Sequence, residues 1–314
     1  MSNCSGNNCS GSGCIEALQA LGWPDHMLRA YSGTLLALGL LLNGAALWVL
    51  CCRLPRWTET RVYMVNLAAA DLCLLCALPF LLRSLRLPAG DSLFCQLSQA
   101  VFLVNRYMSV SLVTAIALDR YLALRHPLWA RRLRSPGRAG AVCAGLWLLV
   151  ASSLGVRWWL GRQEGGFCFS SSAREHSSGS VFSLLGFYPP LAVVVFCSLQ
   201  VLAALARRPA TDAAQAEATR KATRMVWANL LVFVVCFLPL HLVLTVRLAW
   251  GRGFCPLEYA LLVTSSLSNA NCCLDAVCYY FVAREFQEVS APRSSAKACS
   301  GQDSVSMIPA VDRL

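Results

Sequence analysis

Seven long apolar stretches constrain the fold of this sequence more than any other feature. They cover residues 28–52, 62–82, 94–124, 139–160, 181–206, 222–248 and 257–282. About 20 consecutive apolar residues are enough for an α-helix to cross the hydrocarbon core of a bilayer. Hydrophobic residues make up 57% of the chain and charged residues only 14%, whereas a soluble domain averages roughly 25% charged residues. We therefore predict an all-α membrane protein, a seven-transmembrane helix bundle.

The basic residues indicate how the bundle is oriented. They concentrate after the first, third and fifth stretches, as Arg53, Arg56, Arg61, Arg125, Arg131, Arg132, Arg134, Arg138, Arg207, Arg208, Arg220, Lys221 and Arg224. Because Lys and Arg favour short cytoplasmic loops, we expect the N-terminus outside the cell and the C-terminus inside. The same distribution explains the net charge of +11 without a nucleic-acid partner.

Three parts follow along the chain. We expect an extracellular N-terminal segment at residues 1–27, the seven-helix domain at 28–282, and a cytoplasmic part at 283–314. The cytoplasmic part would begin with a short amphipathic eighth helix and continue as a disordered tail with candidate phosphorylation sites. The N-terminal segment lacks the basic and apolar regions of a signal peptide. Its asparagines Asn3 and Asn8 stand in Asn-Cys-Ser sequons, so glycosylation is expected there.

Six of the 17 cysteines fall on the predicted outer side, where oxidation favours disulfides. They are Cys4, Cys9, Cys14, Cys95, Cys168 and Cys255. Cys95 opens the third span and Cys168 lies within the loop after the fourth, so a bridge between them would tie that loop over the bundle. Cys255 would pair with one N-terminal cysteine, and the sequence leaves open which.

Polar residues interrupt most of the apolar stretches. They include Asn43, Asn66, Asp71, Asn105, Arg106, Asn229, His241, Asn269, Asn271 and Asp275. A charge at the centre of a bilayer costs about 2.5–3.5 kcal/mol on insertion scales, so such groups normally face the bundle interior. The asparagines also fit simple hydrogen bonding between helices. The two acids, with Asn43 and Asn271 nearby, would instead hold a cation or a proton through oxygen ligands.

Motifs in successive spans point to a family. They are Gly-Leu-Leu-Leu-Asn43, Asn66-Leu-Ala-Ala-Ala-Asp71, Cys95, Asp119-Arg120-Tyr121, Trp147, Pro190, Cys236-Phe237-Leu238-Pro239 and Asp275-Ala276-Val277-Cys278-Tyr279. Because these motifs occur in this order, the chain resembles the rhodopsin-like (class A) G-protein-coupled receptors over nearly its whole length. Two departures stand out: Phe237 replaces the usual Trp, and Asp275-Ala276 replaces Asn-Pro. The lost proline removes one source of a kink in the seventh span.

The resemblance implies a switch at the cytoplasmic end of the third span. In this family the arginine of the triplet, here Arg120, is held by its neighbour Asp119 in the inactive state. It would turn toward a G-protein helix when the third and sixth spans separate, which is a population shift. The other switch residues implied are Tyr121, Phe237, Pro239 and Tyr279. The resemblance also implies a sodium pocket at Asp71 with Asn43, Asn271 and Asp275, and no other cofactor.

A second group of residues suggests the ligand. Arg106 lies 14 residues before Arg120, about 21 Å toward the outside along a helix. Arg157 and Arg247 lie near the outer ends of the fourth and sixth spans. Arginine pairs with carboxylate and phosphate, so these residues predict an anion pocket, with Tyr107, Phe169 and His241 as aromatic walls. Alternatively, the two outer arginines reach the lipid headgroups, and Arg106 forms an internal ion pair or hydrogen bonds.

The function implied is a cell-surface receptor in the plasma membrane for small acidic ligands, either carboxylates or phosphates. The resemblance adds inhibitory and twelve/thirteen-class heterotrimeric G proteins and arrestin as partners, alongside membrane lipid. A transporter or ion channel using the intramembrane acids is the alternative, but no internal repeat supports it. An enzyme is not expected, since the histidines His26, His126, His176 and His241 show no metal-ligand spacing.

Overall fold

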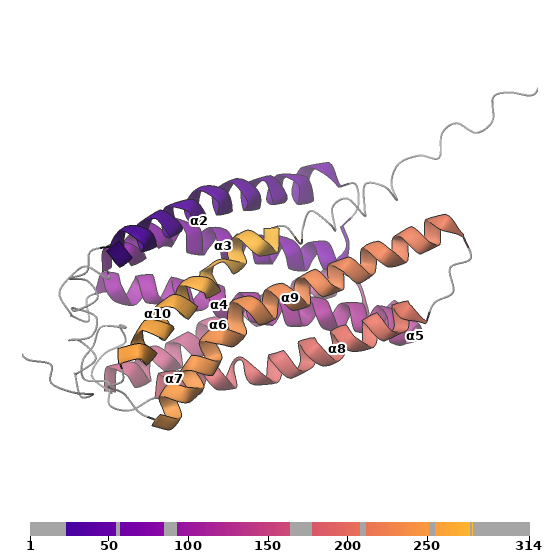
Figure 1. The fold of residues 1–314 in the computed structure, drawn as a ribbon. Helices are drawn as coiled ribbons and strands as arrows, with labels where there is room; N and C mark the ends of the chain where they lie inside the picture. The colour runs from indigo at the N-terminus through magenta and orange to yellow at the C-terminus, as the bar shows by residue number, and fades with distance from the viewer. Residues whose placement is uncertain are drawn as a thin grey trace, which may run out of the picture.

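The computed structural model describes residues 23–54, 57–84, 93–163, 178–207, 212–250, 255–276 and 278. They form an elongated bundle of helices that run side by side along its length (Figure 1). The predicted eighth helix and tail, the sequon residues Asn3 and Asn8, and the loop residues Cys168 and Phe169 lie outside the described residues.

The helices follow the apolar stretches closely. In chain order they are α2 (Trp23–Trp48), η1 (Val49–Arg53), α3 (Glu59–Ser84), α4 (Leu93–Arg125), α5 (Pro127–Leu133), α6 (Pro136–Gln163), α7 (Ser178–Leu185), α8 (Tyr188–Ala206), α9 (Ala213–Trp250) and α10 (Cys255–Asn269). Six segments within the described residues are long and apolar enough to cross a membrane, and they match the first six predicted spans. The seventh predicted span corresponds to α10 and the helical residues 271–276.

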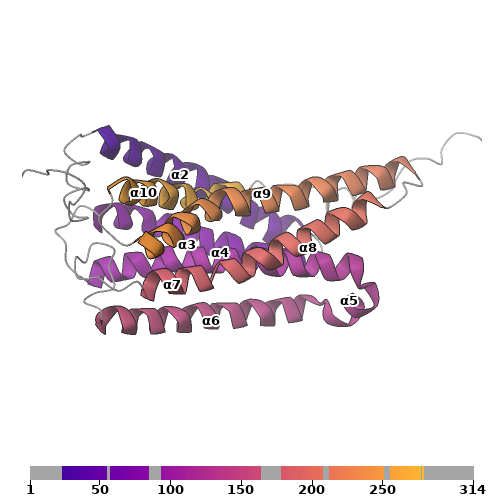
Figure 2. The same cartoon turned by 60° about the horizontal axis from the view of Figure 1, so that its bottom comes forward.

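The helix α4 occupies the centre of the bundle. It contacts α3, α5, α6, α8 and α9, and Figure 2 shows it between α3 and α6. In its most apolar window 61% of residues are buried, against 22% in α2 and in α6. Large apolar side chains on the outer helices, such as Leu41 and Leu148, are exposed. Exposed apolar side chains suit contact with lipid. The backbone of these helices also suits the bilayer, because a helix satisfies its backbone polar groups internally.

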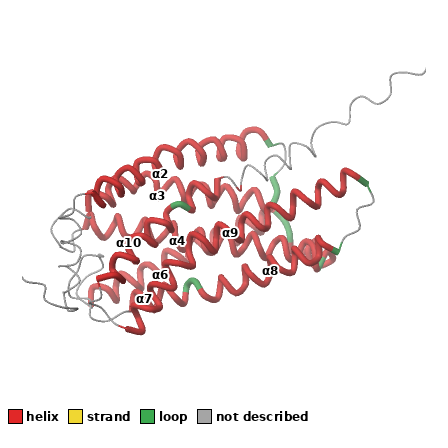
Figure 3. The backbone as a smooth tube through the Cα atoms, in the orientation of Figure 1, coloured by secondary structure: helices red, strands yellow, loops and turns green. Residues whose placement is uncertain are grey.

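The fifth predicted span is not one continuous helix. Gly186 and Phe187 form a turn between α7 and α8, which Figure 3 shows as a short loop segment. Prolines open α8 and cannot donate a backbone hydrogen bond, so the helix restarts there. A Cβ atom at Gly186 would stand 3.3 Å from the Phe182 carbonyl oxygen and 3.4 Å from Tyr107 Cε1. The glycine thus allows the turn to lie close against α4.

The seventh span breaks without a proline. The chain makes a turn at Ala270, where Ala270 N bonds Leu267 O at 3.0 Å, a tight i→i−3 bond. Asn43 on α2 donates from Nδ2 to the Cys272 carbonyl at 2.7 Å, which satisfies a backbone acceptor beside the break. The interruption therefore lies five residues before the motif at Asp275, and a hydrogen bond from another helix lies beside it.

The short helix α5 was not predicted. It lies in the basic connection between α4 and α6, and Pro127 opens it, a position where proline is favoured. Its end leads directly to Arg134, which contacts the Asp-Arg-Tyr motif as described below.

Candidate functional site

Arg106 is buried in the centre of the bundle. Its side chain is 6% exposed, and its Nε and Nη2 atoms have no hydrogen-bond partner. Its guanidinium carbon lies 4.4 Å from the centroid of the Phe102 ring, a favourable cation–π contact. Nε and Nη2 form one edge of the guanidinium, and this edge matches the two oxygens of a carboxylate. The ion pair that was one alternative for Arg106 does not occur among the described residues.

Arg157 points into the bundle rather than toward lipid headgroups. It is 9% exposed, and its Nη1 donates to Tyr107 Oη at 3.0 Å, to Ser183 Oγ at 3.1 Å and to the Gly179 carbonyl at 3.2 Å. These partners come from α4 and α7, so they fix the position of the guanidinium. It is close enough to Arg106 for the two charges to repel each other. The structure thus places two cations near each other, and among the described residues neither forms an ion pair with an acid.

His241 belongs to an aromatic ladder that joins α9 to the start of α8. Its ring stacks on Phe187 with centroids 3.7 Å apart and an interplanar angle of 9°. Phe187 stacks in turn on Phe233 at 5.8 Å, and Phe233 contacts Phe237 edge-on at 5.5 Å. His241 also lies within electrostatic range of Arg106. Phe187 and Phe233 were not predicted, because a phenylalanine within an apolar stretch is usually an ordinary core residue.

The remaining predicted ligand residue within the described part, Arg247, lies in the last turn of α9 and is half-buried. Cys95, at the start of α4, is disulfide-bonded. Cys255 is the first residue of α10. Its predicted N-terminal partners, Cys4, Cys9 and Cys14, lie outside the described residues.

The intramembrane acids meet in a buried polar cluster. Asn105 Nδ2 donates to Asp71 Oδ1 at 2.9 Å, and Asn271 Nδ2 donates to Ser109 Oγ at 3.0 Å, with Asp275 Oδ2 at 3.5 Å. Asp71 and Asp275 interact electrostatically. Ser109 was missed, although it stands one turn after Asn105 on the same helix face.

This cluster fits a hard cation. It combines two carboxylates, a hydroxyl and the Oδ1 atom of Asn271, which has no hydrogen-bond partner, and hard cations prefer such oxygen ligands. Asn43 makes no hydrogen bond to these acids. Its Nδ2 donates to the Cys272 and Gly39 carbonyls, while its Oδ1 has no hydrogen-bond partner. The donor set therefore suits the predicted sodium ion, with Asn43 acting as a link between helices.

The acid of the Asp-Arg-Tyr motif pairs with an arginine that follows α5. Arg134 donates from Nε to Asp119 Oδ1 at 2.8 Å and from Nη2 to Oδ2 at 3.0 Å, and it also reaches Glu59 at 3.5 Å. In this structure Asp119 pairs with Arg134, and the pair with Arg120 that the resemblance implies for the inactive state stays a prediction. Adjacent residues on a helix do not face each other, whereas Arg134 approaches from a separate segment. Burial lowers the pKa of Arg134, but Asp119 and Glu59 raise it by more, so its net pKa lies above the ordinary value.

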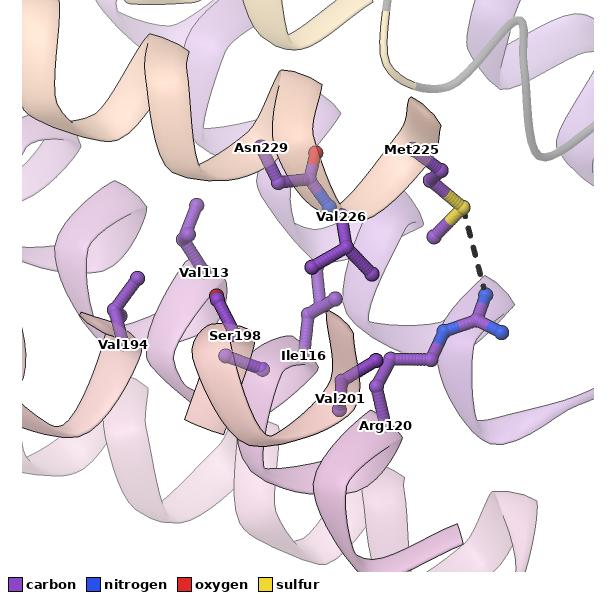
Figure 4. Close-up of a pocket in the computed structure, with 10 residues that line it drawn as sticks. Val113, Ile116, Arg120, Val194, Ser198, Val201, Met225, Val226 and Asn229 are labelled. Carbon is purple, nitrogen blue, oxygen red and sulfur yellow. Dashed lines mark hydrogen bonds between the residues drawn. The ribbon is translucent and has the colours of Figure 1, made fainter. Parts of the chain in front are cut away.

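Arg120 instead extends along a crevice between α4, α8 and α9 (Figure 4). Its Nη2 contacts Met225 Sδ on α9 at 3.8 Å. The crevice is lined by Val113, Ile116, Ala117, Arg120, Val194, Ser198, Val201, Met225, Val226 and Asn229. Arg120 therefore bridges the third and sixth spans at the end that is predicted to face the cytoplasm.

The other switch residues are divided between described and undescribed parts. Tyr121 Oη lies 3.3 Å from His126 Nε2, and its ring packs against Phe196. Phe237 is buried in the aromatic ladder, two residues before Pro239 inside α9. Tyr279 lies outside the described residues.

A bundle of membrane-length helices with buried arginines in one half and the Asp-Arg-Tyr motif in the other is the arrangement expected of a membrane receptor. The family described as 7 transmembrane receptor (rhodopsin family) matches residues 42–297, and the chain belongs to that family. The human protein named G-protein coupled receptor 35 is 65% identical over 294 residues, covering 91% of this chain and 94% of the relative. The mouse protein of the same name is 62% identical over 282 residues, covering 88% and 92%.

A more distant relative is named for its ligand. Mouse lysophosphatidic acid receptor 4 is 35% identical over 272 residues, covering 80% of this chain and 73% of the relative. Family membership makes the chain a multi-pass plasma-membrane receptor rather than an enzyme, with a G protein and a small ligand as its partners. The transporter and channel alternative loses its basis.

Proposed function

We propose that the chain is a receptor for small acidic ligands, in which Arg106 binds the carboxylate or phosphate group. The observation that carries the proposal is the unpartnered Nε and Nη2 edge of this buried guanidinium. The same edge of Arg134 holds both oxygens of Asp119 elsewhere in this molecule. A buried charged donor without a partner is costly, so an acid bound there would relieve that cost.

Arg157 supports the same ligand class. Its hydrogen bonds to Tyr107, Ser183 and Gly179 use neutral acceptors, so its positive charge is not neutralised locally. Two cations held near each other raise the local positive potential, which attracts an anion. The relative named for lysophosphatidic acid is consistent with a phosphate as well as a carboxylate.

The half of the bundle that carries Arg120 would pass the signal on, and we call it the output half; the half that carries Arg106 is the input half. An acid bound at Arg106 would favour the conformation in which α4 and α9 separate, releasing Arg120 from Met225 toward a G protein. Inhibitory and twelve/thirteen-class G proteins and arrestin are the proposed partners. The N-terminus would lie outside the cell, with Asn3 and Asn8 glycosylated, and sodium bound at Asp71 and Asp275 would favour the closed state.

Matched acids and neutral analogues test the input half. Aromatic monocarboxylates and lysophosphatidic acid, with the corresponding methyl esters and monoacylglycerol, are applied to cells expressing the receptor while G-protein activation is recorded. The acids should activate and the neutral forms should not. Arg106→Ala should lower acid potency by at least about 30-fold, since a buried charge pair loses one partner. Arg106→Lys should recover only part of it, because lysine keeps the charge but not the fork.

Surface expression is measured for every variant, and Leu148→Ala on the exposed face of α6 serves as the control. Unchanged acid potency in Arg106→Ala would refute the proposal. For the output half, Arg120→Ala should abolish G-protein activation while radioligand binding of the same acids persists. Normal activation in that variant would refute the switch assignment.

A further inference from the structure

Gln99 carries the least explained polar group of α4. Its side chain is 1% exposed, and neither Nε2 nor Oε1 has a hydrogen-bond partner. A carboxamide offers two donor hydrogens and an acceptor oxygen. Leaving all of them unmet inside a protein is costly, and buried polar atoms are nearly always paired.

Other buried or half-buried amides in this bundle show what pairing looks like here. Asn43, Asn66, Asn105 and Asn271 each donate from Nδ2 to a defined acceptor, namely the Cys272 carbonyl, the Val62 carbonyl, Asp71 and Ser109. These amides link helices or bond within one. Gln99 makes no such bond, so the packing of helices does not account for it.

The position of Gln99 relates it to Arg106. Seven residues separate the two on α4, which is nearly two full turns, so their side chains leave the same helix face. The rise between them is roughly 10 Å. Phe102 lies between them on this face, and its ring already contacts the Arg106 guanidinium. One face of α4 therefore carries an unpartnered amide, an aromatic ring and an unpartnered guanidinium edge in succession.

We propose that Gln99 is a second ligand-recognition residue, whose amide binds a hydrogen-bonding group of the ligand roughly 10 Å from the acid held at Arg106. The segment joining the two groups passes over Phe102 and is therefore apolar or aromatic. The preferred ligands are elongated acids with a distal donor–acceptor group such as a carboxamide or hydroxyl. This inference rests on the proposed function, because it takes Arg106 as the site of the acid.

Two matched acids test it. One probe is 4′-carbamoylbiphenyl-4-carboxylate, whose carboxamide can pair with that of Gln99. The other is 4′-isopropylbiphenyl-4-carboxylate, which has the same shape without the polar group. The wild-type receptor should respond to the carbamoyl acid at about tenfold lower concentration, since a site built for a polar group rejects an analogue that leaves it unpaired.

Gln99→Leu should remove this preference. It lowers the potency of the carbamoyl acid by about tenfold and leaves or improves that of the isopropyl acid, because the buried amide is gone. Gln96→Leu is the matched control: Gln96 lies on the same helix, but its Oε1 accepts from Trp158 Nε1 at 2.9 Å. That variant should keep the wild-type preference. Gln99→Asn, which retains the amide on a shorter side chain, should keep part of it and serves if Gln99→Leu does not reach the surface.

The outcomes separate the two proposals. Equal potency of the two acids at the wild-type receptor, or an unchanged preference in Gln99→Leu, would overturn the role of Gln99. If Arg106→Ala abolishes both responses while Gln99→Leu affects both acids alike, only the Gln99 inference fails. If Arg106→Ala leaves both responses intact, the proposed function itself fails.

Discussion

Arg134 donates a hydrogen bond to each oxygen of Asp119, from Nε to Oδ1 at 2.8 Å and from Nη2 to Oδ2 at 3.0 Å. This pair ties the acid of the Asp-Arg-Tyr motif to the segment between α5 and α6. Thr60 and Glu59 at the start of α3 approach the same pair at 3.5 Å. Three segments of the bundle are therefore joined at one charge cluster beside Arg120.

Removing Arg134 should destabilise the receptor. Asp119 is 7% exposed and would be left as a buried charge without a cation, while the Arg134 side chain is 28% exposed, so solvent screens part of the effect. We expect a loss of about 1–2 kcal/mol in Arg134→Ala, seen as a lower melting temperature of the solubilised receptor. The double variant with Asp119→Asn should recover part of the loss. Strictly additive effects would contradict the pairing.

Two glycines on α2 should respond oppositely to alanine. A Cβ atom at Gly39 would stand 2.7 Å from both δ-carbons of Leu75, which is fully buried, whereas one at Gly44 meets nothing within 4 Å. Gly39→Ala should therefore lower stability by about 1–3 kcal/mol through overpacking. Gly44→Ala should be neutral or raise stability by up to about 1 kcal/mol, the helix preference of alanine over glycine. Thermal melting of both variants in one detergent measures the difference, and equal shifts would contradict it.

The hydrogen bonds of Arg157 should matter for acid potency. Tyr107→Phe and Ser183→Ala each remove one acceptor from Nη1 while keeping the shape of the site. Each should lower the potency of an aromatic carboxylate by roughly 3- to 10-fold, because the guanidinium is less well positioned. Potency equal to wild type in the double variant would show that these bonds do not position Arg157. Surface expression controls for misfolding.

Sodium should stabilise the receptor through the acids of the polar cluster. Replacing sodium chloride by N-methylglucamine chloride at equal ionic strength should lower the melting temperature, because an ion that binds only the folded state stabilises it. Asp71→Asn and Asp275→Asn should each reduce this dependence. A sodium effect that is the same size in both variants would place the ion elsewhere.

Much of the fold was predictable because bilayer thickness sets the length of an apolar span. The breaks at Gly186 and Ala270 were not predicted. The prolines that open α8 are a local cause of the first, but its close approach to Tyr107 and the hydrogen bond of Asn43 beside the second come from other helices. The absence of a proline at position 276 was expected to remove one source of a kink, but the helix is interrupted at Ala270 instead. Local sequence does not contain these tertiary contacts.

The site was predictable only in part. Charged residues such as Arg106 and Asp71 stand out in apolar sequence, because burying them demands a reason. Gln99 and Ser109 did not stand out, because an amide or a hydroxyl in a helix is common. Only the structure shows that Gln99 has no hydrogen-bond partner and that Ser109 accepts from Asn271. The pairing of Asp119 with Arg134 was not predicted, because Arg134 lies 15 residues further along the chain and only the path of the connection brings it back to Asp119.

The burial of α4 has a consequence for the surrounding membrane. Among the six described spans, the helix that carries Gln99, Arg106 and Arg120 has the largest buried share of its apolar window, while α2 and α6 have the smallest. Changes in lipid thickness are absorbed by tilting of the spans that touch the acyl chains. The helix that joins the proposed acid site at Arg106 to Arg120 therefore has little contact with lipid, and its geometry should hold as the receptor moves between membranes of different composition.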